Sequence, residues 1–189
     1  MVAAEYDVEG LEILGATVIQ LNAELTETRR QLLRANRELK RNEATIRELM
    51  LTDALTGVGN RRRLDEALAV EVENSRRCGD ALCLLIADLD HFKEVNDRCG
   101  HAAGDEALKR FAALLRDHCR QSDLVARLGG EEFVLLLPNA HLETAVTCAE
   151  RIRQRLESQP LAPQMGRVTA SFGVAMLADH EEGEGLLRR

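Results

Sequence analysis

A regular spacing of apolar residues constrains the N-terminal part of this chain more than any other feature. Twelve positions follow one another at alternating intervals of three and four residues, and ten of the twelve are apolar. These positions are Leu11, Leu14, Val18, Leu21, Leu25, Thr28, Leu32, Ala35, Leu39, Asn42, Ile46 and Leu49. A mean period of about 3.5 residues predicts a coiled coil, because a lone helix would leave this row of leucines in water.

We expect residues 1–50 to form a long helix that pairs in a parallel two-stranded coiled coil. An amphipathic helix that folds back on its own domain is the alternative. In the parallel arrangement Glu38 of one chain faces Glu43 of the other, and Asn42 occupies a core position. Asn42 either fixes the register of the two helices or, together with that repulsion, keeps the dimer adjustable.

The composition leaves room for one compact domain after this helix and excludes several classes of protein. The chain has 189 residues with 32 acidic and 25 basic side chains, so a net charge of −7 offers no overall positive field for nucleic acid. Its five cysteines form no Cys-x-x-Cys pair, which argues against a disulfide framework or a zinc site and favours the cytoplasm. The N-terminus lacks the features of a signal peptide, and no apolar stretch approaches the ~20 residues of a membrane span.

The pattern after residue 51 predicts an α/β (α+β) domain with the order βαββαβ, which is the ferredoxin-like unit. The unbroken apolar run that ends at Asp88 is typical of a strand buried on both faces. The expected elements are a turn-rich joint at 53–60, a helix at 61–77, a strand at 81–87, a helix at 103–119, strands at 124–128 and 133–137 that form a hairpin, a helix at 142–156 and a strand at 168–177.

This topology brings two carboxylates together. The first and third strands of such a unit are antiparallel neighbours, so Asp88 should lie beside Glu131. With Asp90 nearby and no Cys or His ligand set, an all-oxygen site suits Mg²⁺ or Mn²⁺ and leaves positions for phosphate oxygens. Taken singly, each feature also has a structural alternative. In that alternative Gly129-Gly130 forms only a hairpin turn, and Asp88 and Asp90 cap the exit of a strand.

Four motifs in a fixed order carry a resemblance to a known family. They are Asp53-Ala-Leu-Thr-Gly-Val-Gly-Asn-Arg-Arg62, Asp88-Leu-Asp-His-Phe-Lys-Glu-Val-Asn-Asp97, Gly100-His-Ala-Ala-Gly-Asp105 and Gly129-Gly-Glu-Glu-Phe133. Residues 51–189 resemble the diguanylate cyclase family, also called GGDEF domains, whose namesake motif is the last of the four. The resemblance implies condensation of two GTP molecules into cyclic di-GMP, with release of pyrophosphate, on a polymerase-palm-like fold.

The resemblance also implies the roles of the catalytic residues. Asp88, Glu131 and the backbone carbonyl of Leu89 would bind Mg²⁺ or Mn²⁺ that bridges the GTP phosphates. Glu131 is the implied proton acceptor for the 3′-hydroxyl group as well, although a metal-bound carboxylate is a poor base. Lys93, expected in a short loop after the strand, would stabilise charge in the transition state. A solvated surface lysine is the alternative for Lys93.

The substrate-binding residues implied by the resemblance follow the same strand and the signature. Asn96 and Asp105 would read guanine, whose N1–H and N2–H₂ donors one carboxylate can accept together. His101 matches a family position near the nucleotide, with a helix-cap or packing role as the alternative. Glu132 continues the signature among the substrate-binding residues, and Phe133 is expected in the core.

A second implied site binds the product. Arg120-Gln-Ser-Asp123, which five residues separate from the double glycine, matches the family's Arg-x-x-Asp inhibitory site. Arg120 would hold phosphate and stack on guanine, while Asp123 would accept hydrogen bonds from the base edge. A surface ion pair is the alternative for this motif.

The implied reaction needs two copies of the domain. Each GTP must supply both a nucleophile and an electrophile to its twin, so the family works as a homodimer and the coiled coil supplies proximity. We expect the input to arrive through a regulatory protein that binds the N-terminal helices. The alternative function is a catalytically inactive module that acts as a receptor for cyclic di-GMP or GTP.

The C-terminal end departs from the family pattern. Family members continue past the final strand into a further helix, whereas this sequence stops at Gly185-Leu-Leu-Arg-Arg189. We therefore expect a domain over residues 51–189 whose C-terminal end is shortened.

Overall fold

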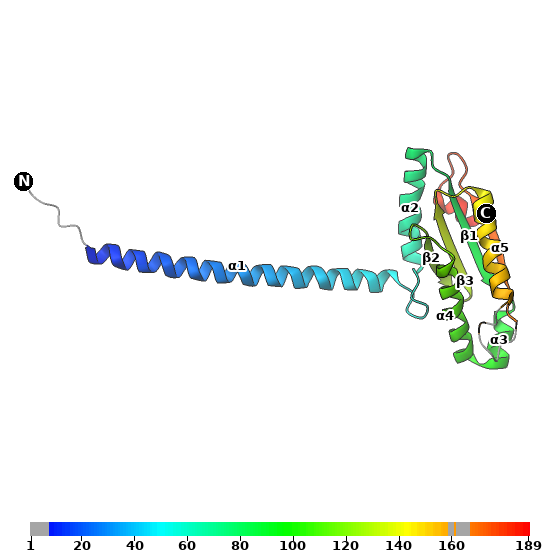
Figure 1. Cartoon of the computed structure of the whole chain (residues 1–189), viewed down its shortest axis with the longest axis horizontal. Coiled ribbons are helices and arrows are strands. Elements are labelled where there is room, and N and C mark those ends of the chain that lie inside the picture. The colour runs from blue at the N-terminus through cyan, green and yellow to red at the C-terminus, as the bar shows by residue number, and fades with distance from the viewer. Residues whose placement is uncertain (1–7, 159–160, 162–166) are drawn as a thin grey trace, which may run out of the picture. The chain divides into compact units, whose positions relative to one another are not determined.

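The computed structural model describes residues 8–158, 161 and 167–189 (Figure 1). The chain divides into two compact units, Met1–Arg47 and Glu48–Arg189. Helix α1 (Val8–Leu51) accounts for the described part of the first unit and ends within the second. Its side chains in the predicted seam are exposed on the single helix, and Leu32, for example, retains 66% of its accessible surface. The predicted long N-terminal helix is therefore confirmed.

The second unit contains one antiparallel sheet in the order β2-β3-β1-β4. Its strands are β1 (Leu82–Leu89), β2 (Leu124–Gly129), β3 (Glu132–Pro138) and β4 (Ala170–Met176). The central strand β1 pairs with both β3 and β4. The predicted neighbourhood of the first and third strands is thus confirmed, together with the ferredoxin-like order.

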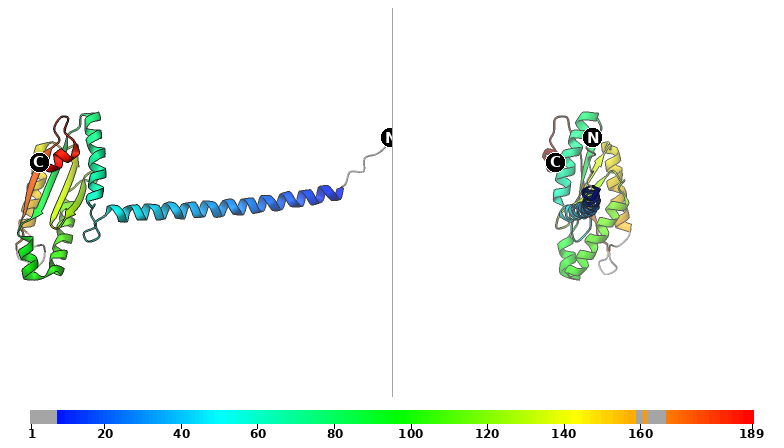
Figure 2. Two further views of the ribbon diagram at one scale, coloured as in Figure 1. Left: turned by 180° about the vertical axis from the view of Figure 1, so that it is seen from behind. Right: turned by 90° about the vertical axis from the view of Figure 1, so that its left-hand side faces the viewer.

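Helices cover both faces of the sheet, as the two views of Figure 2 and the core contacts agree. These helices are α2 (Arg61–Cys78), α3 (Phe92–Cys99), α4 (His101–Asp117), α5 (Leu142–Ser158) and α6 (Gly183–Arg188). Side chains of α4 and α5 pack with Leu85 and Ala87 of β1, whereas α2 and α6 pack with Leu82 and Leu84. Because successive side chains of a strand point to opposite faces, β1 feeds both cores, as its unbroken apolar run predicts.

Phe133 lies in the larger of the two cores, as predicted. Its side chain is fully buried, and its ring meets that of Phe111 edge to face with centroids 5.2 Å apart. This contact fixes the first residues of β3 against α4. The glycine-rich turn therefore leads into a strand whose first residues are held in place.

The turn-rich joint connects α1 to α2 and covers the outer edge of β2. Gly59 donates its N–H to the carbonyl of Val125 at 3.0 Å and accepts from the N–H of Arg127 at 2.7 Å. Asn60 caps α2 by accepting from the N–H of Arg63, and its amide donates to the carbonyl of Met50 at 2.8 Å. The start of α2 and the end of α1 are thus tied to one residue.

The expectation that Lys93 lies in a loop is wrong, because residues 92–99 form helix α3. Phe92 and Val95 stand three residues apart and are both buried, which gives this short helix one apolar face. Gly100 then takes a positive φ of 83° and separates α3 from α4. Because Gly100 separates the two helices, α4 begins at His101, whereas the sequence predicted a start near residue 103.

Candidate active site

The carboxyl end of β1 and the start of β3 bring acidic side chains together. Asp88 is opposite Glu132 in the β1–β3 ladder, and Glu131 directly precedes that position. Burial raises the pKa of Asp88, and the negative charges of Glu131, Glu132 and Asp90 raise it further. The structure therefore brings Asp88 close to Glu131, as the topology predicts. The negative charges gathered there disfavour the ionised form of Asp88.

A divalent cation would relieve this repulsion, and the donors fit one. Asp88, Glu131 and the carbonyl of Leu89 offer three hard oxygen donors, which suits a small cation that keeps sites for phosphate or water. Within residues 8–158, 161 and 167–189, three or more His, Cys, Asp or Glu side chains do not gather into a metal-binding group.

Asp90 points to the opposite neighbour of β1. Its two carboxylate oxygens accept hydrogen bonds from the hydroxyl groups of Thr169 and Ser171 at 2.6 and 2.7 Å. Partial burial disfavours the charged form, but these hydrogen bonds outweigh it and lower the pKa of Asp90. The sequence placed Asp90 near the oxygen site, and the structure shows that one of its oxygens is bound by Ser171 of β4 and the other by Thr169, which directly precedes β4.

The glycine-rich turn is held by a side chain that the sequence analysis did not single out. Gly130 has a φ of 52°, which favours glycine, and its carbonyl accepts from Nε and Nη2 of Arg127 at 2.9 and 2.7 Å. Nη1 of Arg127 lies 3.2 Å from Oδ1 of Asp53. Arg127 therefore fixes the backbone immediately before Glu131.

The predicted catalytic lysine and three of the predicted substrate-binding residues lie on the paired helices α3 and α4. Lys93 and Asn96 belong to α3, while His101 and Asp105 belong to α4. Apart from the half-buried Asn96, these side chains are exposed. Glu132 is also exposed and begins β3. The helix pair thus presents Lys93, His101 and Asp105 to solvent beyond the end of β1, whereas Asn96 lies partly between the two helices.

Gly104 of α4 is a second residue that the sequence analysis did not assign. A Cβ at this position would overlap Oδ1 of Asn96 and would lie 3.2 Å from the ring of Phe92. The absence of a side chain therefore lets α3 approach α4 and gives the Asn96 amide its place. The glycine is visible in the third motif, but only the packing of the two helices reveals why it is needed.

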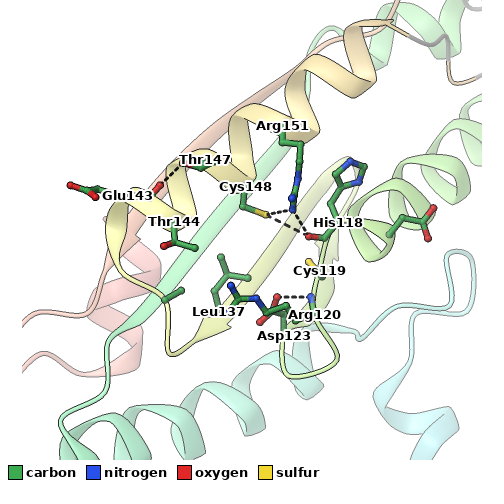
Figure 3. A pocket seen from close by; sticks show the side chains of 12 residues that line it. His118, Cys119, Arg120, Asp123, Leu137, Glu143, Thr144, Thr147, Cys148 and Arg151 are labelled. Carbon is green, nitrogen blue, oxygen red and sulfur yellow. Dashed lines mark hydrogen bonds between the residues drawn. The ribbon is translucent and has the colours of Figure 1, made fainter.

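Arg120 and Asp123 line a separate cavity of about 780 Å³ (Figure 3). Asp123 accepts a hydrogen bond at 2.7 Å from the backbone N–H of Arg120 rather than from its guanidinium group. Arg151 of α5 lines the same cavity and donates to the carbonyl of His118 at 2.9 Å. The cavity therefore combines two arginines with three carboxylates, those of Asp117, Asp123 and Glu143. Arg151 carried no signal in the sequence because α5 is distant along the chain.

Two thiols also line this cavity. They are Cys119 and Cys148. Burial raises the pKa of Cys119 to about 12, which keeps its thiol protonated and unreactive at neutral pH.

Comparison with known proteins places this geometry in a family. The profile described as "Diguanylate cyclase, GGDEF domain" matches residues 50–189. Diguanylate cyclase DgcP from Pseudomonas aeruginosa strain PAO1 is 43% identical over 145 residues, which cover 76% of this chain. This chain spans only about a fifth, 22%, of the length of that curated relative.

Two solved structures extend the similarity to α1. The coiled coil and GGDEF domain of DgcB from Caulobacter crescentus, in complex with c-di-GMP, is 28% identical with a TM-score of 0.78 over 89% of each chain. The diguanylate cyclase SiaD from Pseudomonas aeruginosa, in complex with its activator SiaC, is 34% identical with a TM-score of 0.69. That match covers 96% of this chain and 74% of SiaD.

In the part of the chain that the structure describes, no helix combines the length and apolar character needed to cross a bilayer. The four motifs, the sheet order and the matched profile agree with one another. The chain belongs to the GGDEF, or diguanylate cyclase, domain family.

Proposed function

We propose that this protein is a diguanylate cyclase that condenses two GTP molecules into cyclic di-GMP and releases two pyrophosphates. The observation that carries the proposal is the meeting of Asp88 and Glu131 at the ends of β1 and β3. Two carboxylates and a carbonyl meet where the central strand β1 ends beside the start of β3, a site called the acidic edge below. These are the donors that a phosphate-bridging Mg²⁺ or Mn²⁺ needs. When bound, this cation would neutralise phosphate charge during the attack of the 3′-hydroxyl on the α-phosphorus.

The remaining chemistry belongs to side chains around this edge. Glu131 accepts the proton of the 3′-hydroxyl, and Lys93 of α3 contributes a positive charge to the phosphates. Asn96 and Asp105 hold the guanine, because a carboxylate pairs with its N1–H and N2–H₂ donors and repels the N1 acceptor of adenine. His101 and Glu132 complete the substrate-binding surface. GTP is therefore preferred over ATP.

The proposed enzyme acts as a homodimer. Each domain carries one substrate half-site, so two domains must face each other, and pairing of α1 raises their effective concentration. The exposed apolar seam of α1 supports this pairing, since burying it needs a second helix. The relative DgcB has a structure described as a coiled coil and GGDEF domain.

Product inhibition and regulation complete the proposal. The cavity with Arg120, Asp123 and Arg151 offers guanidinium groups for phosphate and a carboxylate for guanine, which suits cyclic di-GMP. A regulatory protein acts on the N-terminal helices, as the complex of the relative SiaD with its activator SiaC supports. Both the GTP substrate and the reduced thiols are consistent with a cytoplasmic location.

Incubation with GTP and Mg²⁺, followed by chromatography, tests the activity. We expect one cyclic di-GMP and two pyrophosphates for every two GTP consumed. Glu131→Gln should abolish product while the protein stays folded, and Glu73→Gln on α2 serves as the matched control because Glu73 is remote in sequence from every candidate site residue. Bound but unchanged GTP would instead favour the receptor function.

A further inference from the structure

Asp90 makes three hydrogen bonds to the start of β4 and to the residue that directly precedes it. Its N–H donates to the carbonyl of Thr169 at 2.9 Å. Its carboxylate accepts from the hydroxyl of Thr169 at 2.6 Å and from the hydroxyl of Ser171 at 2.7 Å. Asp90 is therefore joined to Thr169 through both its backbone and its side chain, and to Ser171 of β4 through its side chain.

These bonds lie where the chain leaves the sheet. The β1–β4 ladder ends with Leu89 opposite Ala170, and the bonds of Asp90 extend the pairing by one step. Directly afterwards, His91 takes a left-handed conformation with a φ of 56° and the chain turns into α3. Without this anchor, the last residues of β1 would continue into a turn with only the ladder to hold them.

The anchored segment contains two donors of the oxygen site. Asp88 and the carbonyl of Leu89 lie on the strand that Asp90 ties to β4, and the Asp88 side chain is opposite Ser171 in the ladder. Each carboxylate oxygen of Asp90 accepts one hydrogen bond from a hydroxyl group. Residues that orient metal ligands in this way commonly change metal affinity or activity by ~10–100-fold when mutated.

We propose that Asp90 is a positioning residue, which clamps the end of β1 to β4 so that Asp88 and the Leu89 carbonyl keep the geometry for a divalent cation. This inference rests on the proposed function. It assigns Thr169 and Ser171 to the same task, because each supplies one hydroxyl to the clamp. Asp90 itself stays out of the ligand set.

A double variant, Thr169→Val with Ser171→Ala, separates positioning from ligation. It leaves the Asp90 carboxylate intact and removes only its hydroxyl partners. If Asp90 positions the ligands, Mn²⁺ affinity measured by electron paramagnetic resonance without nucleotide should fall about tenfold or more. The Mg²⁺ concentration for half-maximal cyclic di-GMP synthesis should rise by a similar factor. If Asp90 were a ligand, releasing it would leave both values unchanged or improved, and the proposal would be wrong.

A matched control is the pair Thr45→Val and Ser75→Ala. These hydroxyls donate to the carbonyls of Arg41 and Asp80 and not to Asp90, so Mn²⁺ affinity should stay at the wild-type value. Circular dichroism and thermal unfolding establish that each variant is folded. A control that weakens Mn²⁺ binding as much as the clamp variant would overturn the proposal.

Asp90→Asn and Asp90→Ala provide a second test where the double variant does not fold. The amide of asparagine can accept from one hydroxyl and donate to the other, so it should retain Mn²⁺ affinity within about fivefold, whereas alanine should not. Equal losses in both folded variants contradict the positioning role. Because Mn²⁺ binding is measured without turnover, a wild-type protein that binds Mn²⁺ but makes no product would refute the proposed function and leave this inference standing.

Discussion

The guanidinium group of Arg127 links Asp53, which follows α1, to the carbonyl of Gly130, which precedes Glu131. Nη1 lies 3.2 Å from Oδ1 of Asp53, and Nε and Nη2 both donate to Gly130. The two charged side chains are only 13% and 23% exposed, so the ion pair is better shielded from solvent than a typical surface pair. Arg127 thus connects the start of the domain to the glycine-rich turn before Glu131.

Replacing Arg127 with lysine should lower kcat about tenfold or more with little change in the KM for GTP. A lysine ammonium cannot reproduce two parallel bonds to Gly130 together with the contact to Asp53, so the turn before Glu131 loses its fixed geometry. Steady-state kinetics measure the effect, and Arg62→Lys at an exposed position of α2 is the control. Equal kcat values for both variants and wild type would refute this role of Arg127.

Asp53→Asn should destabilise the domain at pH 7 by about 1.5–3 kcal/mol, the range for hydrogen bonds to charged groups. Partial burial disfavours the charged form, but hydrogen bonds from Thr56 and Arg127 outweigh it and lower the pKa of Asp53 below 3.8. Because the folded-state pKa is depressed, this stabilisation is present above the unfolded pKa and is lost as the pH falls through the folded value. Urea unfolding at pH 7 and pH 3 should therefore show the gap between variant and wild type closing in acid. A gap that persists at pH 3 would argue for a packing defect instead.

Much of the fold is readable in the sequence because its signals are local. The seam of α1 repeats over many turns, and β1 is an apolar run that only a strand buried on both faces explains. Once the strand order is known, the meeting of Asp88 and Glu131 follows from topology. Helix α3 was not predicted because its two buried residues, Phe92 and Val95, are too few to establish a helical period.

The missed residues of the site depend on tertiary contacts. Arg127 reads as one polar residue in a strand, and its role exists only where the joint, β2 and the glycine turn meet. Gly104 matters because α3 crosses close to α4, and Arg151 because α5 lies beside the loop that carries Arg120. Such approaches leave no periodic trace along the chain.

Gly104→Ala should raise the KM for GTP about tenfold by displacing the amide of Asn96. A Cβ at this position would overlap Oδ1 of that side chain and lie 2.9 Å from its Cγ. Asn96→Ala should give a similar loss, and the two changes together should cost little more than either, because both remove one interaction. Gly15→Ala is the control, since its Cβ would meet nothing within 4 Å. Multiplicative effects on KM would show that Gly104 acts by another route.

Arg151→Ala should raise the cyclic di-GMP concentration for half-maximal inhibition about tenfold. Losing one charge-assisted hydrogen bond to phosphate costs about 1.5–3 kcal/mol, and each 1.4 kcal/mol corresponds to a factor of ten. Initial rates at low product should stay unchanged because the cavity is separate from the acidic edge. Arg153→Ala, whose guanidinium group bonds Glu150 at 2.8 Å and Glu157 at 3.1 Å instead, should leave inhibition at the wild-type value. If both variants shift inhibition equally, general charge rather than the cavity is responsible.

Two adjacent leucines of α1 test the homodimer. Leu32 lies in the predicted seam and Leu33 outside it, and both are largely exposed on the single helix, by 66% and 52%. Leu32→Asp and Leu33→Asp introduce the same charge at neighbouring positions of one helix, so they differ only in whether a partner helix would bury the change. The seam variant should weaken the dimer about 100-fold, since losing a buried leucine costs about 2–5 kcal/mol.

Analytical ultracentrifugation and the dependence of activity on protein concentration provide the readouts for this pair. Leu32→Asp should sediment as a monomer at concentrations where wild type and Leu33→Asp are dimers, and its specific activity should rise steeply with protein concentration because two half-sites must then meet by diffusion. High protein concentration should restore its turnover, since the change leaves the residues of the acidic edge intact. Dimers of equal strength in both variants would mean that α1 does not pair through this seam, and activity that is independent of concentration in a monomeric variant would contradict catalysis between two domains.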